Sequence, residues 1–132
     1  MLSTFCLALV VFVEARGEPL DGQLMVAEVV LNRVAIDAYP DTVCGVVFDP
    51  KQFSGLNKPV DLATILEDDA WGTSVDIAYD ALSGNTLGTT ATHFHNHRVR
   101  PYWVDSMDKL GVYGKHTFYI EQRREPRWKM NN

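Results

Sequence analysis

With 132 residues, of which 46% are hydrophobic and 22% charged, the chain is long enough for one domain with a sizeable buried core. The same composition, without any low-complexity tract, excludes a disordered or fibrous protein. The formal net charge of −5 at pH 7 argues against a nucleic-acid-binding protein.

The chain begins with an apolar run, residues 5–13, that could be mistaken for part of a signal peptide. No basic residue precedes the run, no small-residue cleavage site follows it, and it is too short to span a bilayer. We therefore predict a first helix of the folded domain, capped by Ser3 or Thr4 and ended near Ala15 by Gly17. We expect a protein made in the cytoplasm, without a classical export signal or membrane insertion.

A second helix is predicted from Pro19, which suits a first helical turn, to the Tyr39-Pro40-Asp41 break. Its apolar residues recur at alternating spacings of four and three, which predicts one buried stripe. The stripe comprises Leu20, Leu24, Ala27, Leu31, Val34 and Ala38, and Val26, Val29 and Val30 widen it. Glu28 interrupts the apolar run, and we expect it to be solvated or paired near Arg33.

The rest of the chain predicts a mixed structure. Residues 42–48 fit either a strand or a helical turn, and the composition of residues 49–61 is typical of a loop. A further helix fits residues 63–83, and residues 91–96 and 116–120 have the β-branched and aromatic content of short strands. One face of that helix is expected to hold Trp71, Val75, Ala78 and Leu82, with Gly84 beyond its end. The sum is an α+β domain, mainly helical, with a small late sheet or hairpin.

The two cysteines, Cys6 and Cys44, lie in apolar surroundings and lack CxxC spacing. This pattern favours buried free thiols over a disulfide or a metal site.

Several short motifs follow one another in a specific order. They are EARGEP at 14–19, VVLNR at 29–33, QFS at 52–54, ATHF at 91–94 followed by Asn96, and Gly114 with His116 and Phe118-Tyr119. Together they resemble the SleB/CwlJ family of cell wall hydrolases, from about Leu7 to Tyr119. The resemblance implies a lysozyme-like fold related to that of lytic transglycosylases, peptidoglycan glycan strands as the substrate, and no cofactor. It also implies a catalytic domain, residues 1–120, that acts as a monomer, and we expect residues 121–132 to be a basic, solvated tail.

Glu14 ends the apolar helix. Cleavage of a glycosidic bond requires protonation of the leaving oxygen, and a glutamic acid can supply that proton near neutral pH only if apolar surroundings raise its pKa. The preceding residues 10–13 are apolar, and the negative end of the helix dipole also disfavours a carboxylate there. The resemblance implies that Glu14 is the catalytic acid. The alternative is a surface glutamate in the last helical turn.

Glu18 is a second carboxylate, and it either stabilises the start of the next helix or forms part of the site. A hydrolase needs a second carboxylate about 5–9.5 Å from the acid, as a nucleophile or as a base. The resemblance implies instead a lytic transglycosylase, in which the substrate's own 6-hydroxyl attacks and Glu14 acts as acid and then as base. Its product carries a 1,6-anhydromuramyl end. Hydrolysis of the muramidase type is the alternative.

Gln52, Phe53 and Ser54 are substrate-binding candidates, because an amide, a ring and a hydroxyl in a loop can hydrogen-bond to and stack on a sugar. The alternative is turn chemistry around Gly55. The resemblance places Phe94, Asn96, His116 and Tyr119 on the opposite wall, and we expect Phe118 to be in the core.

His93, His95 and His97 alternate, so on a strand they share one face, and with His116 they suggest a zinc-dependent hydrolase as a rival. The family pattern normally has an aromatic residue at position 95 and a proline at 97, so we favour solvent-facing histidines and no metal. A catalytically inactive glycan-binding protein is the third possibility. A bare catalytic domain would suit a phage endolysin released by a holin, or a domain cut from a longer protein.

Overall fold

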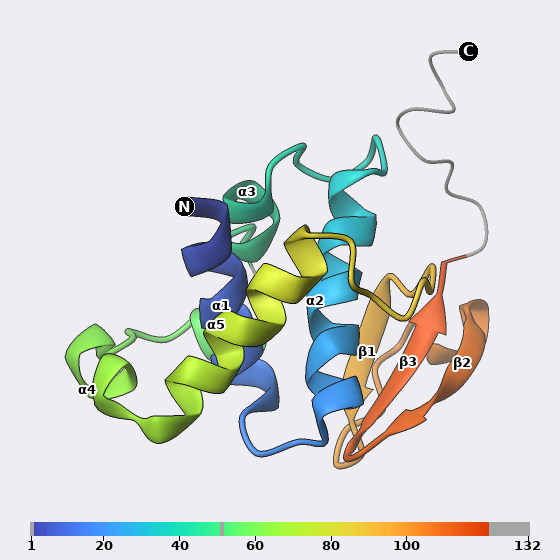
Figure 1. Cartoon of the computed structure of the whole chain (residues 1–132). Helices are drawn as coiled ribbons and strands as arrows, with labels where there is room; N and C mark the ends of the chain where they lie inside the picture. The colour runs from blue at the N-terminus through green and yellow to red at the C-terminus, as the bar shows by residue number, and fades with distance from the viewer. Residues whose placement is uncertain (1, 51, 122–132) are drawn as a thin grey trace.

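The computed structural model describes residues 2–50 and 52–121, which form a mainly helical α+β domain, as predicted. In chain order the elements are α1 (Leu2–Ala15), α2 (Leu20–Val34), α3 (Val43–Val47), η1 (Ser54–Leu56), α4 (Leu62–Glu67), α5 (Asp69–Leu82), β1 (His93–Asn96), η2 (Val104–Ser106), β2 (Asp108–Tyr113) and β3 (His116–Ile120). Figure 1 shows α1 and α5 packed on one side of α2 and the sheet on the other side. The basic tail predicted for residues 121–132 lies outside the described residues, except for Glu121.

Helix α1 is apolar on almost all sides because α2, α3, α5 and η1 surround it. Leu7, Val10 and Val11 are fully buried, and each such side chain stabilises the fold by about 1.5–3 kcal/mol. The N-terminal apolar run is therefore a core helix of the domain, as predicted. Within the described residues, no helix has the length and hydrophobicity needed to cross a bilayer.

Helix α2 ends at Val34, before the break predicted at Tyr39-Pro40-Asp41. The next amides bond three residues back, from Ala35 to Asn32 and from Ile36 to Arg33, which tightens the chain out of the helix. The prediction of the buried stripe is confirmed at Val26, Ala27, Val29 and Val30, which are fully buried. It is wrong at Leu20, which is 64% exposed, and Met25 is fully buried in addition.

The polar side chains of α2 hold the irregular segment 87–92 in place. Both carboxylate oxygens of Glu28 accept backbone N–H bonds, from Leu87 at 2.8 Å and from Thr89 at 3.0 Å. Asn32 Nδ2 donates to the carbonyls of Thr89 and Ala91 at 3.0 and 2.8 Å. The expectation that Glu28 is solvated or paired near Arg33 is therefore wrong, because the residue is 2% exposed and its carboxylate binds backbone amides.

The predicted helix 63–83 is two helices, α4 and α5, separated at Asp68. Asp68 has an extended backbone, and its side chain caps α5 by accepting from the Ala70 amide at 2.8 Å. The buried face of α5 is also rotated from the prediction, because Leu82 is 39% exposed. Its buried residues are Ser74, Ile77, Ala78 and Ala81. Gly84, with φ +89°, follows the end of the helix as predicted.

The described strands form one antiparallel sheet in the order β1-β3-β2. β1 and β3 were predicted, and Phe118 of β3 is fully buried, as expected. β2 was missed, because its sequence DKLGVY is largely exposed and includes a glycine at a register shift, so it lacks an alternating apolar pattern. Residues 42–48, left open between strand and helix, contain α3.

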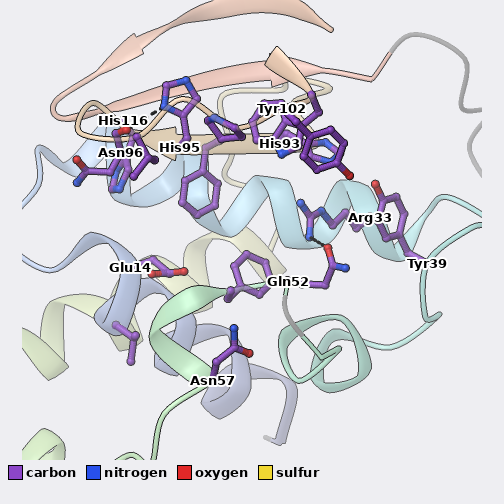
Figure 2. Close-up of a pocket in the computed structure, with 16 residues that line it drawn as sticks. Glu14, Arg33, Tyr39, Gln52, Asn57, His93, His95, Asn96, Tyr102 and His116 are labelled. Atoms are coloured by element: carbon purple, nitrogen blue, oxygen red, sulfur yellow. Dashed lines mark hydrogen bonds between the residues drawn. The ribbon is translucent and has the colours of Figure 1, made fainter. Parts of the chain in front are cut away.

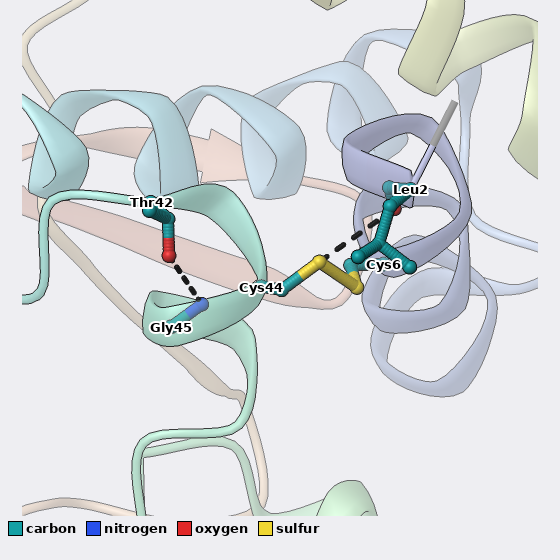
Figure 3. Close-up of a disulfide and its surroundings, with 5 residues drawn as sticks. All are labelled: Leu2, Cys6, Thr42, Cys44 and Gly45. Atoms are coloured by element: carbon teal, nitrogen blue, oxygen red, sulfur yellow. Dashed lines mark hydrogen bonds between the residues drawn. A yellow bond between two sulfur atoms is a disulfide. The ribbon is translucent and has the colours of Figure 1, made fainter.

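Cys6 and Cys44 form a disulfide, so the prediction of free thiols is wrong. The bond joins α1 to α3, which pack together and bring the two Cα atoms within 5.3 Å (Figure 3). A separation of 38 residues gives no local spacing cue, so only the packing of these helices reveals the pair. Cys44 Sγ also lies 3.6 Å from the Leu2 carbonyl oxygen. This contact is not a hydrogen bond, because a disulfide sulfur carries no hydrogen to donate.

Removing the disulfide should lower stability without changing the fold. Chain-entropy arguments for a loop with this separation of 38 residues give a loss of up to about 4 kcal/mol. We expect a lower Tm for wild-type protein in dithiothreitol and for the Cys6→Ser/Cys44→Ser double variant. The Tm of the double variant should not respond to dithiothreitol. An unchanged Tm of the reduced wild type would contradict a stabilising role.

Glu28→Gln should destabilise the domain, because a glutamine has one acceptor oxygen, whereas the backbone N–H groups of Leu87 and Thr89 each use one oxygen of the Glu28 carboxylate. The expected loss is about 1–3 kcal/mol in the free energy of unfolding, measured with urea. The control is Glu67→Gln, which changes an exposed carboxylate at the end of α4 and should leave the free energy within about 0.5 kcal/mol. Equal stabilities for the two variants would show that the buried carboxylate is dispensable.

Candidate active site

A groove of about 730 Å³ lies between the C-terminal end of α1, the 52–57 segment and strand β1 with the loop that follows it. Figure 2 shows Glu14 on one side of this groove and His93, His95 and Asn96 on the other. The lining residues are Val13, Glu14, Arg33, Tyr39, Gln52, Phe53, Asn57, His93, Phe94, His95, Asn96, Val99, Pro101, Tyr102, Trp103 and His116.

Glu14 lies in the last turn of α1 with its carboxyl group in the groove. Burial among apolar neighbours raises the pKa of this carboxyl, and a hydrogen bond from the Gly55 backbone partly opposes the rise. A Cβ at position 55 would overlap Val13 and lie 3.3 Å from Glu14 Oε2, so glycine permits this close approach. The geometry therefore favours a protonated Glu14, as a general acid requires.

Glu14 is the only carboxylate among the described residues that line the groove. Glu18 does not line it. Its carboxylate accepts the Lys115 backbone N–H at 2.6 Å and lies 3.8 Å from His116 Nδ1. The described groove therefore offers one acid and no second carboxylate to act as base or nucleophile.

The 52–54 segment contributes two of its three predicted residues to the groove. Gln52 Oε1 accepts from Arg33 Nη1 at 3.2 Å, a contact marked in Figure 2, and Phe53 is 2% exposed. The Phe53 ring stacks on Phe94 with centroids 6.2 Å apart, which connects the 52–54 segment to β1. Ser54 begins η1, and its side chain lies outside the described part of the chain.

The predicted residues of the opposite wall divide into two groups. Phe94, Asn96 and His116 line the groove. Tyr119 does not line it, since it lies behind the wall, where its hydroxyl is 2.9 Å from His95 Nε2. Tyr119 therefore supports a groove-lining residue rather than facing the groove itself.

The histidines do not converge on one point. His95 uses both ring nitrogens, at 2.9 Å from the Asn96 carbonyl and 2.9 Å from the Tyr119 hydroxyl, and His93 Nδ1 is 3.0 Å from Thr92 Oγ1. His97 lies beyond the strand, in a turn. Within residues 2–50 and 52–121, no three His, Cys, Asp or Glu side chains are grouped to hold a metal ion. The described residues therefore contain no ligand set of the kind that the zinc-dependent hydrolase hypothesis requires.

Several lining residues were not among the predicted site residues, and Tyr102, Trp103 and Arg33 are the most informative of them. Tyr102 is 97% exposed at the edge of the groove, and the Trp103 ring packs against His93 with centroids 4.9 Å apart. The Pro-Tyr-Trp sequence in a polar loop was the signal, since exposed aromatic residues there often bind ligands. Arg33 is 4% exposed, donates to the Thr92 carbonyl at 2.8 Å and faces the Phe53 ring. Burial lowers the Arg33 pKa, while nearby acidic groups oppose this.

A family model described as Cell Wall Hydrolase matches residues 17–119, most of the chain. The chain belongs to this cell wall hydrolase family. The match confirms the family predicted from the motifs, although it begins three residues after Glu14. Because the match does not include Glu14, the role of Glu14 is inferred from the groove geometry.

The relatives include a spore cortex-lytic enzyme of Oceanobacillus iheyensis, 34% identical over an alignment of 113 residues that covers 82% of this chain and 38% of that protein. Two solved structures share the fold. The catalytic domain of the germination-specific lytic transglycosylase SleB from Bacillus anthracis has a TM-score of 0.71 and 30% identity, covering 89% of this chain and 93% of that one. The catalytic domain of Bacillus cereus SleB has a TM-score of 0.70 and 30% identity, covering 90% and 91%. The chain thus spans about two fifths of the curated relative and nearly all of each catalytic domain.

The raised pKa of Glu14 has a consequence for stability. A carboxyl group with a higher pKa in the folded state stabilises the fold below its unfolded pKa, and this contribution is lost as the pH rises through the folded pKa. We expect Glu14→Gln to have a higher Tm than wild type near pH 7, with the difference shrinking as the pH falls through the folded pKa of Glu14 toward about 4.5. Thermal unfolding from pH 4 to 8 measures this, with Glu67→Gln as an exposed control. A Tm difference that is independent of pH would contradict the raised pKa.

Proposed function

We propose that this domain cleaves peptidoglycan glycan strands between N-acetylmuramic acid and N-acetylglucosamine by lytic transglycosylation. The observation that carries the proposal is Glu14, a desolvated acid and the only carboxylate among the described groove-lining residues. The relatives, a spore cortex-lytic enzyme and a lytic transglycosylase, support the same substrate and reaction.

In the proposed reaction, Glu14 donates its proton to the glycosidic oxygen as the bond to muramyl C1 breaks. The 6-hydroxyl of the same muramyl residue then bonds to C1 and gives its proton to the Glu14 carboxylate. The products are a free N-acetylglucosamine hydroxyl and a 1,6-anhydromuramyl end, and Glu14 is again protonated. No water is consumed, so no second carboxylate is required.

The residues around Glu14 fit supporting roles in this reaction. The stacked Phe53 and Phe94 rings add apolar surface to the groove lining, and apolar surroundings favour the protonated form of an acid. The amides of Gln52 and Asn96 line the groove, and their chemistry suits hydrogen bonds to sugar hydroxyl and acetamido groups. We propose both as substrate-binding residues.

The disulfide bears on where the domain acts. Such bonds persist in oxidising surroundings and are rare in reducing cytosol. The Cys6–Cys44 bond therefore supports action on the cell wall after release from the cytoplasm, through a holin if a phage encodes the protein.

The reaction products test the proposal. Purified peptidoglycan is digested with wild type, Glu14→Gln and the control Glu67→Gln, and the soluble fragments are analysed by mass spectrometry. We expect anhydromuramyl ends from wild type and control, and a rate about 10²–10⁴-fold lower for Glu14→Gln, because the general acid is removed.

Other outcomes point to the alternatives. Reducing muramyl ends would mean hydrolysis by a positioned water. Equal release by wild type and Glu14→Gln would remove Glu14 from the chemistry, and no release by any of the three proteins would favour a glycan-binding protein.

A further inference from the structure

Glu18 connects the α1–α2 loop to the turn between β2 and β3. Its side chain is 12% exposed, and Oε1 accepts the Lys115 backbone N–H at 2.6 Å. Gly114 has φ +61°, and a Cβ there would lie 2.5 Å from Glu18 Oε1 and 2.7 Å from Pro19 Cδ. The turn between β2 and β3 therefore packs directly on the carboxylate of Glu18.

The next residue in this turn region is His116, the first residue of β3, which reaches the groove. His116 is 5% exposed, and its ring packs edge-on to Phe94 with centroids 5.2 Å apart. His116 Nδ1 is buried without a hydrogen-bond partner among the described residues, and Glu18 Oε1 lies 3.8 Å from it. A carboxylate can only accept a hydrogen bond. The ring nitrogen beside it, Nδ1, is therefore favoured in its protonated state.

The charge state of His116 follows from its surroundings. Burial lowers its pKa, the Glu18 carboxylate raises it, and His95 and His97 lower it further. The imidazole is therefore neutral near pH 7 and carries one N–H. With that proton on Nδ1, on the Glu18 side, Nε2 has a free lone pair and lies on the opposite edge of the ring.

We propose that Glu18 is a positioning residue that holds His116 in the Nδ1–H tautomer, so that Nε2 accepts a hydrogen bond in the groove. The donor is a hydroxyl or an acetamido N–H of the glycan strand, so the inference rests on the proposed function. It gives the second carboxylate of the EARGE motif a role in substrate binding, through His116, and none in proton transfer.

The tautomer is tested first on the wild-type protein, without substrate. Long-range ¹H–¹⁵N spectra distinguish the two imidazole nitrogens, and the expected result for His116 is a protonated Nδ1 and an unprotonated Nε2 near pH 7. Glu18→Gln should lower the His116 pKa, because it removes the negative charge that raises it. An Nε2–H tautomer in wild type, or an unchanged pKa in Glu18→Gln, overturns the proposal.

Kinetics on soluble glycan strands tests the contact with substrate. We expect Glu18→Gln and His116→Phe each to lower kcat/KM about tenfold, the size of one hydrogen bond, with the same product ends as wild type. In the His116→Phe background, Glu18→Gln should have no further effect, because Glu18 acts through His116. Additive losses in the double variant would overturn this coupling.

The two tests separate this inference from the proposed function. Wild-type protein that releases no anhydromuramyl ends contradicts the proposed reaction, while the spectra still decide the state of His116. Anhydromuramyl ends from wild type, together with unchanged spectra and kinetics in Glu18→Gln, would overturn only the role of Glu18.

Discussion

The groove depends on how α2 holds the segment that leads into β1. Residues 87–92 have no regular secondary structure, so their backbone groups need other hydrogen-bond partners. Glu28, Asn32 and Arg33 supply them from successive turns of one helix, with a carboxylate for two N–H groups, an amide for two carbonyls and a guanidinium for a third. Because this set of bonds fixes where β1 begins, it also fixes the groove wall opposite Glu14.

Glu14 differs in its hydrogen-bond partners from Glu18 and Glu28, the other two glutamates of α1, α2 and the loop between them. Glu18 and Glu28 each accept backbone N–H bonds from a segment far along the chain. Glu14 has the Gly55 backbone as its hydrogen-bonding neighbour, and burial outweighs that bond. The acid in the groove is thus the carboxyl group with the least compensation for lost water, so it is the one suited to hold a proton.

Features of the fold and of the site that depend on local sequence patterns could be predicted, and those that depend on contacts between distant segments could not. The α1 helix, β1, β3 and the place of Glu14 follow from local apolar patterns. The disulfide, the role of Glu28 and the place of Tyr119 behind the wall depend on contacts between segments 24 to 61 residues apart, which no local pattern encodes. Strand β2 was missed because pairing with β3, rather than burial of its own side chains, holds it in the sheet.

The four-residue spacing between Glu14 and Glu18 has a structural reason within this fold. Glu14 ends α1, and Gly17, with φ +82°, turns the chain away from the helix before Glu18. The turn directs the two carboxylates to different places, one into the groove and one behind it against the β2–β3 turn. The motif therefore holds, within five residues, the groove acid Glu14 and Glu18, which binds the β2–β3 turn on the opposite side of the groove. A displacement of this loop would move both carboxylates at once.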